Sequence, residues 1–275
     1  FYTVTLIAKN SNSCVDSLSK KVQAYAMPSA QFTVSAVCLH DSMAFNNNSL
    51  GATTYNWNFG DKFVSTSSSP KHLYTNPGRY MASLIARTSN GCADTFEKQV
   101  IVHSLPVAAF KGTTSCFTDT TKFNNSSTGA SNYLWDMGDG SSSILTEPSK
   151  VYGKPASFIV RLIASSSNNC KDTVAHTVVV NSLPSVSFSL NDTCDGKAVT
   201  MVNQTTGAAS YQWNYGDGNG SNSSDPSHTY STNGSYNVKL LATSSMGCKD
   251  SLNKSISIHP LPQIGFNQND VCYGK

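Results

Sequence analysis

The sequence has few charged residues and no long apolar run. Charged side chains make up 13% of the 275 residues, against roughly 25% in an ordinary globular protein. The net charge of +3 is spread along the chain without runs of one sign, which argues against a nucleic-acid partner. No apolar segment approaches the about 20 residues that a membrane-spanning helix needs. Ser, Thr and Asn provide the polar surface instead, and no membrane span is expected in this sequence.

Patterns that carry catalysis are also missing. The chain shows no nucleophile elbow, zinc-protease motif, phosphate-binding loop or paired carboxylates. Its six histidines do not stand at zinc-ligand spacing with cysteine, and His72 and His228 are expected at the surface or between domains. No segment of helical length has a 3.6-residue apolar period. We therefore expect an all-β protein without enzymatic activity.

What the sequence does contain is a 78-residue repeat. Two series of cysteines, the prolines that open each unit and three tryptophans all return at this constant interval, without insertion or deletion. We call the three complete units the first, middle and third repeats. The expected boundaries are 1–27 for the end of one repeat, 28–105, 106–183 and 184–261 for these three repeats, and 262–275 for the start of another. A window of a longer array is therefore expected.

Each repeat is expected to contain several short strands separated by frequent turn signals, with about seven strands in all and turns roughly every 8–12 residues. In the first repeat, strands are predicted at 29–35, 43–49 and 54–60. A later run places Tyr80, Ala82, Leu84 and Ala86 on one face, and the tail repeats this pattern at residues 2–8. Period two predicts half-buried strands, so the fold class is a row of antiparallel immunoglobulin-like sandwiches.

The most distinctive stretch joins a tryptophan, a Gly-Asp corner, a Pro-x-x-x-Tyr step and a Gly-x-Tyr strand. Trp135-Asp136-Met137-Gly138-Asp139-Gly140 resembles the W-D-F-G-D-G signature of the polycystic-kidney-disease (PKD) domain, with Met in place of Phe. The resemblance covers the whole chain and implies PKD-type sandwiches in a head-to-tail rod. The residues that it assigns to the core signature are Trp57, Trp135, Trp213, Tyr74, Tyr152 and Tyr230.

Further elements are similar to PKD arrays on secreted proteins of Bacteroidota, which often use type IX secretion, and to giant gliding-motility adhesins of the SprB kind. The resemblance implies an extracellular location, either secreted or attached to the outer membrane. Five Asp-Ser or Asp-Thr steps resemble the O-glycosylation motif of those bacteria, with turn residues that start strands as the alternative. The acceptors would be Ser17, Ser42, Thr120, Thr173 and Ser251.

The Gly-Asp corners hold Asp61, Asp139 and Asp217. A carboxylate could bind calcium, a hard cation that prefers oxygen ligands, or it could bond backbone amides in a tight turn. One carboxylate per corner makes a poor calcium cage. We therefore expect the turn role and no cofactor, with calcium as the alternative.

The eight cysteines at fixed spacing predict disulfides. In a sandwich, the turn near Cys38 and the hairpin carrying Cys92 lie at opposite ends, more than about 20 Å apart, whereas disulfide Cα atoms lie within about 7 Å. Successive repeats would bring such ends together, which predicts the interdomain pairs Cys38–Cys170 and Cys116–Cys248. Cys14, Cys92, Cys194 and Cys272 would pair outside this sequence. The alternative keeps the pairs within one repeat, as Cys38–Cys92, Cys116–Cys170 and Cys194–Cys248.

Two functions are consistent with these patterns. The favoured one is a disulfide-stiffened stalk of a large surface adhesin or filament, whose partners are neighbouring repeats and, beyond them, surface polysaccharide or other cells. The alternative is a set of carbohydrate- or protein-binding accessory modules of a secreted hydrolase. That function needs exposed aromatic residues. Most Tyr and Phe are accounted for by the alternating core positions, and Tyr25, Phe63 and Phe96 are left over without equivalents in every repeat.

Overall fold

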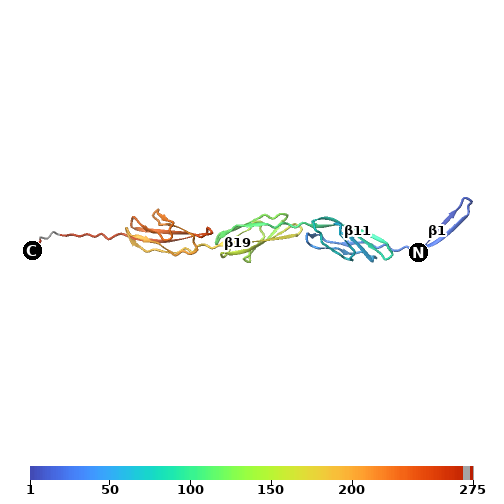
Figure 1. Ribbon diagram of the computed structural model, residues 1–275, viewed down its shortest axis with the longest axis horizontal. Helices are drawn as coiled ribbons and strands as arrows, with labels where there is room; N and C mark the ends of the chain where they lie inside the picture. The colour runs from blue at the N-terminus through green and yellow to red at the C-terminus, as the bar shows by residue number, and fades with distance from the viewer. Residues whose placement is uncertain (269–272, 275) are drawn as a thin grey trace. The chain divides into compact units, whose positions relative to one another are not determined.

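The structure is a computed structural model that describes residues 1–268 and 273–274. The described residues form strands, turns and loops and contain no helix (Figure 1). A two-stranded hairpin, β1 (Tyr2–Lys9) with β2 (Val15–Val22), precedes three sandwiches of the same topology. The expected all-β fold with tandem immunoglobulin-like sandwiches is confirmed.

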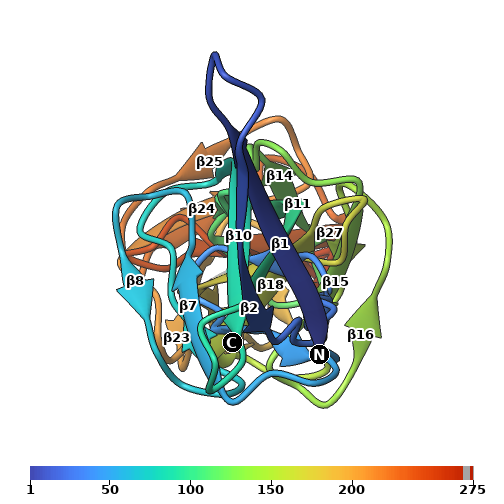
Figure 2. The same cartoon turned by 90° about the vertical axis from the view of Figure 1, so that its right-hand side faces the viewer.

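The first repeat is built on a five-stranded sheet of order β4-β11-β10-β7-β8, faced by two small sheets, β3-β6 and β5-β9. Figure 2 shows β7 between β8 and β10. The strands are β3 (Phe32–Thr33), β4 (Val37–Cys38), β5 (Met43–Ala44), β6 (Asn46–Asn47), β7 (Thr54–Asn58), β8 (Val64–Ser65), β9 (Lys71–His72), β10 (Gly78–Arg87) and β11 (Ala93–His103).

The middle repeat has the same five-stranded sheet, β13-β19-β18-β15-β16, and a three-stranded sheet, β12-β14-β17. Its strands are β12 (Phe110–Gly112), β13 (Ser115–Cys116), β14 (Thr121–Asn125), β15 (Asn132–Asp136), β16 (Ser142–Ser143), β17 (Ser149–Lys150), β18 (Ala156–Ser165) and β19 (Lys171–Asn181).

The third repeat has the sheets β21-β28-β27-β24-β25, β20-β23 and β22-β26. Its strands are β20 (Phe188–Ser189), β21 (Thr193–Cys194), β22 (Ala198–Thr200), β23 (Val202–Asn203), β24 (Ser210–Asn214), β25 (Gly220–Ser221), β26 (Ser227–Thr229), β27 (Gly234–Thr243) and β28 (Lys249–His259).

Alternating side chains explain the long central hairpins. On β10 the buried residues are Ala82, Leu84 and Ala86, which follow the period of two by which successive strand residues face opposite sides of a sheet. The corresponding strand of the tail, β1, is exposed at every residue. The strand expected at 2–8 is formed but is not half-buried, because among the described residues β1 belongs to a two-stranded sheet with β2 alone.

The short strands near the start of each repeat depart from the sequence expectation. The strand predicted at 29–35 is reduced to β3, and the strand predicted at 43–49 is interrupted at Phe45 between β5 and β6. In addition, β4 pairs in parallel with β11, with Cys38 opposite His103, so each large sheet carries one parallel edge in an otherwise antiparallel set. This pairing places the cysteine beside the last residues of its own repeat.

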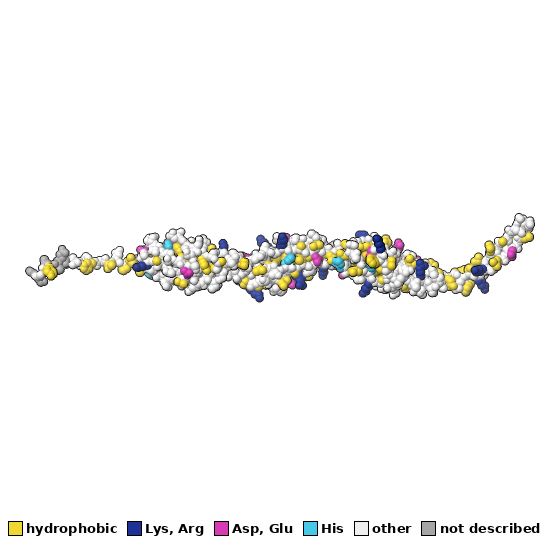
Figure 3. All heavy atoms as spheres, in the orientation of Figure 1, with side chains coloured by type: hydrophobic (Ala, Val, Ile, Leu, Met, Phe, Trp, Pro, Cys, Tyr) yellow, Lys and Arg dark blue, Asp and Glu magenta, His cyan; other side chains and the backbone are white. Residues whose placement is uncertain are grey.

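Each core is centred on its tryptophan. Trp57, Trp135 and Trp213 are at most 2% exposed, and each indole N–H donates to a carbonyl ten residues later, at 2.9 to 3.0 Å. A phenylalanine ring meets each indole edge-on at 5.0 to 5.1 Å, a favoured aromatic geometry. The charged side chains lie scattered on the visible surface (Figure 3).

Candidate functional site

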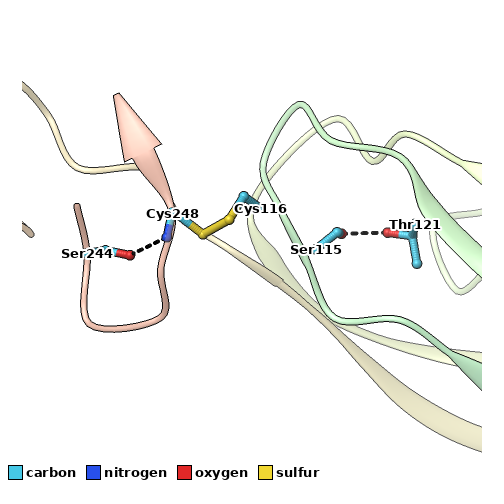
Figure 4. The surroundings of a disulfide bond; sticks show 5 residues. All are labelled: Ser115, Cys116, Thr121, Ser244 and Cys248. Atoms are coloured by element: carbon cyan, nitrogen blue, oxygen red, sulfur yellow. Dashed lines mark hydrogen bonds between the residues drawn. A yellow bond between two sulfur atoms is a disulfide. The ribbon is translucent and has the colours of Figure 1, made fainter. Parts of the chain in front are cut away.

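Two disulfides join successive repeats. Cys38 is bonded to Cys170 with a Cα–Cα distance of 5.5 Å, and Cys116 to Cys248 with 5.6 Å (Figure 4). Both bonds span 132 residues and lie within the usual disulfide range. Each therefore ties the turn after the short parallel strand of one repeat to the β-hairpin of the next.

The remaining cysteines are not brought together in the described part of the chain. Cys14, Cys92 and Cys194 are free thiols, so the pairing within a repeat is not formed there. Cys272 lies outside the described residues. That these four pair with cysteines beyond this sequence stays a prediction.

Both cysteines of each bond lie in tight turns shaped by a left-handed residue. In the turn after Cys38, His40 has φ 73° and the Asp41 N–H donates to the Cys38 carbonyl at 3.0 Å. In the opposing hairpin, Asn169 has φ 62° and the Cys170 N–H donates to a serine hydroxyl at 3.2 Å. Cys170 is 1% exposed. The Cys170 side of the cross-link is therefore shielded from solvent, whereas Cys38 is partly exposed.

The three aspartates of the Gly-Asp corners hold turns. One carboxylate oxygen of Asp61, Asp139 and Asp217 accepts a backbone N–H two residues later, at 3.0 to 3.2 Å. The other oxygen meets a basic side chain that the sequence analysis missed: His72 at 2.6 Å, Lys150 at 2.8 Å and His228 at 2.6 Å. Among the described residues, no group of three or more His, Cys, Asp or Glu is placed to hold a metal ion.

His72 and His228 are partly buried within their own repeats, with side chains 11% and 14% exposed, rather than lying freely on the surface or between domains. His72 stacks on Phe59 at 4.2 Å with an interplanar angle of 4°, and His228 stacks on Tyr215 at 4.2 Å. The sequence signal that could have found these histidines is their constant spacing of 11 residues from the corner aspartate. The middle repeat obscures it because Lys150 replaces the histidine.

The tyrosine of each corner closes the same unit. Tyr152 donates its hydroxyl to the Met137 carbonyl at 3.0 Å, as Tyr74 does to Phe59 and Tyr230 to Tyr215. Burial, followed by the nearby aspartate charge, raises the pKa of Tyr152 and Tyr230 to about 12 and also raises the pKa of Tyr74. These phenols therefore stay protonated and keep donating.

The corner aspartate of the middle repeat stays ionised. Partial burial acts to raise the pKa of Asp139, but hydrogen bonds from Lys150 and Ser141 and the lysine charge outweigh it and lower the pKa to about 2. The pKa of Asp217 is also lowered, against burial, by bonds from Asn219 and His228. The ionised aspartate thus holds the turn in place through its hydrogen bonds.

The remaining predicted residues are the glycosylation candidates and the three aromatic residues without equivalents in every repeat. The five glycosylation candidates, Ser17, Ser42, Thr120, Thr173 and Ser251, are all exposed, and their modification stays a prediction. Beside Thr173, the Asp172 carboxylate also accepts the Ala108 N–H at 2.8 Å, which ties the beginning of the middle repeat to the start of β19. Tyr25 and Phe63 are 46% and 61% exposed, whereas Phe96 packs on Phe32 at 5.2 Å.

Sandwiches of one topology, repeated in tandem and linked by disulfides, define the chain as an array of immunoglobulin-like modules. It belongs to the PKD domain family, which matches residues 22–102, 103–182 and 184–259. PKD domains and disulfides are typical of secreted and extracellular proteins. The described residues include no helix long and apolar enough to cross a membrane.

The chain is similar to parts of three Vibrio proteins. A microbial collagenase of Vibrio alginolyticus is 42% identical over 50 residues, which are 18% of this chain and 6% of the collagenase. The PKD1 domain of the Vibrio cholerae metalloprotease PrtV is 28% identical, with a TM-score of 0.27, and the match covers 28% of this chain and 98% of that domain. The PKD1 domain of Vibrio anguillarum Epp is also 28% identical, with the same TM-score and coverage of 29% and 96%.

Proposed function

We propose that this chain is a cross-linked spacer of an extracellular protein, a stalk that holds another part of that protein away from its anchor. The observation that carries the proposal is the pair of disulfides between successive repeats. A disulfide within one sandwich would stabilise that sandwich alone, whereas a bond between repeats adds a covalent restraint to the short peptide junction.

The junctions themselves support this role. Ser-Leu-Pro connects the first repeat to the middle one and the middle one to the third. Proline fixes its own φ and lacks an N–H donor, and Pro106 and Pro184 are buried. Leu105 lies beside Cys38 and Cys170 in one surface hollow. Such a junction differs from flexible Gly/Ser linkers.

The larger setting that we propose is a surface adhesin or filament of the gliding-motility type, exported by type IX secretion in a bacterium of the Bacteroidota. In that setting the repeats contact each other, and the displayed end contacts surface polysaccharide or another cell. The support is the sequence resemblance of the repeats to such arrays and the Ser, Thr and Asn surface in place of charge.

Small-angle X-ray scattering of the oxidised chain tests the spacer. We expect a narrow range of dimensions that broadens when all four bonded cysteines are changed to serine. Cys92→Ser/Cys194→Ser is the matched control, because these thiols are free, and it should leave the profile unchanged. Equal flexibility of the cross-linked and serine-substituted chains would contradict the spacer function.

A second function is favoured by the similarity to PKD domains of a collagenase and a metalloprotease. As accessory modules of a secreted hydrolase, the repeats would contact a carbohydrate or protein substrate. Phe63 is the exposed aromatic residue available on the first repeat's corner. Pull-down with insoluble collagen and chitin tests this function. Binding that is lost in Phe63→Ala would support it, and the absence of binding to both would contradict it.

A further inference from the structure

The two disulfide loops overlap. One closes residues 38–170 and the other closes residues 116–248, so both enclose residues 116–170 of the middle repeat. The overlap arises because each loop spans 132 residues and is therefore longer than one repeat, such as 28–105. Loops confined to single repeats, such as Cys38–Cys92, would not overlap at all.

We propose that this overlap gives the chain a second covalent route past every backbone position between Cys38 and Cys248, so that cutting or unfolding one repeat cannot separate its neighbours. The inference deepens the proposed spacer function and rests on it, because it states how the spacer keeps its load attached. It depends on which cysteines are bonded and needs no particular arrangement of the repeats.

A backbone cut shows the consequence. After a cut between Cys38 and Cys116, the first part is still held through Cys38–Cys170. After a cut between Cys170 and Cys248, the last part is still held through Cys116–Cys248. Within 116–170 both bonds cross the cut, so either one is sufficient. An extracellular array with this connectivity would keep its far end attached after proteolytic nicking.

The middle repeat presents a loop where such nicking would occur. Between β16 and β17 the chain runs through Ile144 and Leu145, which are 78% and 63% exposed. Exposed loops are the usual sites of proteolysis and tolerate inserted residues. The loop lies inside the doubly bridged segment 116–170, where the redundancy can be measured directly.

A pulling force is also carried along the covalent path through the two disulfides. With both bonds formed, the shortest covalent path through the three repeats enters at Pro28, crosses from Cys38 to Cys170, runs back to Cys116 and crosses to Cys248. At about 3.4 Å per residue, one bond alone would shorten the fully stretched chain by about 450 Å. Because the path must run back along 116–170, the second bond removes only about 80 Å more.

The first test is a cut in the loop after β16. A site-specific protease sequence is inserted there, in a chain whose other cysteines are serine to prevent exchange; these are Cys14, Cys92, Cys194 and Cys272. After cleavage, electrophoresis without reductant should show one covalent species for the chain with both bonds. The variants Cys38→Ser/Cys170→Ser and Cys116→Ser/Cys248→Ser should also stay joined. The chain with all four changes should fall into two fragments.

Separation of the fragments while both disulfides are intact would overturn the proposal, as would separation in either single-bond variant. The outcome is independent of the stiffness on which the spacer function depends. A chain that bends freely in scattering but stays joined after the cut would remove the spacer function and leave the connectivity standing.

The second test stretches the same four chains, held by tags at their two ends, until all repeats are unfolded. Each single-bond chain should be shorter than the bond-free chain by about 450 Å, and the chain with both bonds by about 530 Å. The expected result is therefore strongly non-additive. No shortening in either single-bond chain, or shortening of the doubly bonded chain by much more than about 530 Å, would show a different cysteine pairing and would overturn the proposal.

Discussion

The Gly-Asp corner of the middle repeat differs from the corners of the outer two. In the first and third repeats, a histidine pairs with the aspartate and lies flat on an aromatic ring, as His72 does on Phe59. In the middle repeat, Lys150 pairs with Asp139, and Met137 stands where the aromatic ring would be. The basic residue and the residue beneath it therefore change together.

What does not change is the backbone task of the corner. All three aspartates accept the N–H two residues later, and all three tyrosines donate to the carbonyl two residues before the aspartate. A metal site would require its ligands to be kept, whereas here His and Lys are exchanged. The comparison indicates that the corner stabilises the fold and that its basic residue can be His or Lys when the residue beneath it changes too.

The largest expected effect falls on the glycine shared by all three corners. Gly138 has φ 75°, and a Cβ there would lie 2.5 Å from the Ile159 carbonyl oxygen. Gly138→Ala should destabilise the middle repeat by about 3 kcal/mol, because steric clash adds to left-handed strain. Hydrogen exchange in β18 measures the loss, and β10 and β27 in the outer repeats are internal references.

Gly140→Ala is the matched control. Gly140 also has a left-handed φ, of 89°, but nothing lies within 4 Å of its Cβ position. Gly140→Ala should therefore lower the stability of the middle repeat only by the left-handed backbone strain, about 1 kcal/mol. Equal losses for the two glycines would show that the close approach to β18 is unimportant and that the corner is held by its side chains alone.

The acid stability of the middle corner is expected to be the next largest effect. The pKa of Asp139 lies near 2 in the folded chain, below its ordinary 3.8. Its stabilisation is therefore present above pH 3.8 and is lost as the pH falls through about 2. After discounting for solvent screening, we expect about 1 kcal/mol. An NMR titration of the Asp139 carboxyl should show the low midpoint, and Lys150→Met should move it upward. An unchanged midpoint would exclude the lysine as its cause.

A third experiment tests whether the basic residue at position 150 and the residue beneath it at position 137 are energetically coupled. Lys150→His alone should destabilise the middle repeat, because the imidazole would lie on Met137 and would have no aromatic ring to stack on. Met137→Phe/Lys150→His should recover the loss with a coupling of about 0.5–1 kcal/mol, the value of a favourable ring pair. Hydrogen exchange in β18 gives the four stabilities of the cycle. Simple additivity would mean that the two residues vary independently.

The sequence predicted those features of the fold that depend on a periodic pattern of residues. Alternation located the hairpin of Leu84, and the recurrence of Trp57 located the core. It missed β4 and its parallel pairing because a two-residue strand has no period to detect. The sequence analysis also missed the basic partner of the corner aspartate, because the residue type changes from His to Lys at Lys150. Spacing alone left two cysteine pairings open, because both recur with the period of the repeat, and only the placement of the turns in space distinguishes them.

The smallest effect concerns a second difference between the repeats, in the turn that follows Cys38, Cys116 and Cys194. Its left-handed residue is His40 in the first repeat, Thr118 in the middle repeat and Gly196 in the third, with φ between 73° and 76°. A β-branched residue is strained in this region, and Thr118 is exposed. Thr118→Gly should relieve the strain, partly offset by the greater freedom of glycine in the unfolded chain.

The net gain in the middle repeat should be about 0.5 kcal/mol, read from hydrogen exchange in β19. The reciprocal change Gly196→Thr should cost the third repeat a similar amount, because Lys197 closes that turn with the same bond to the cysteine carbonyl, at 3.1 Å. A loss in Thr118→Gly would mean that the threonine side chain supports the turn beside Cys116, so the sign of this small change separates backbone strain from a role for the side chain next to the cross-link.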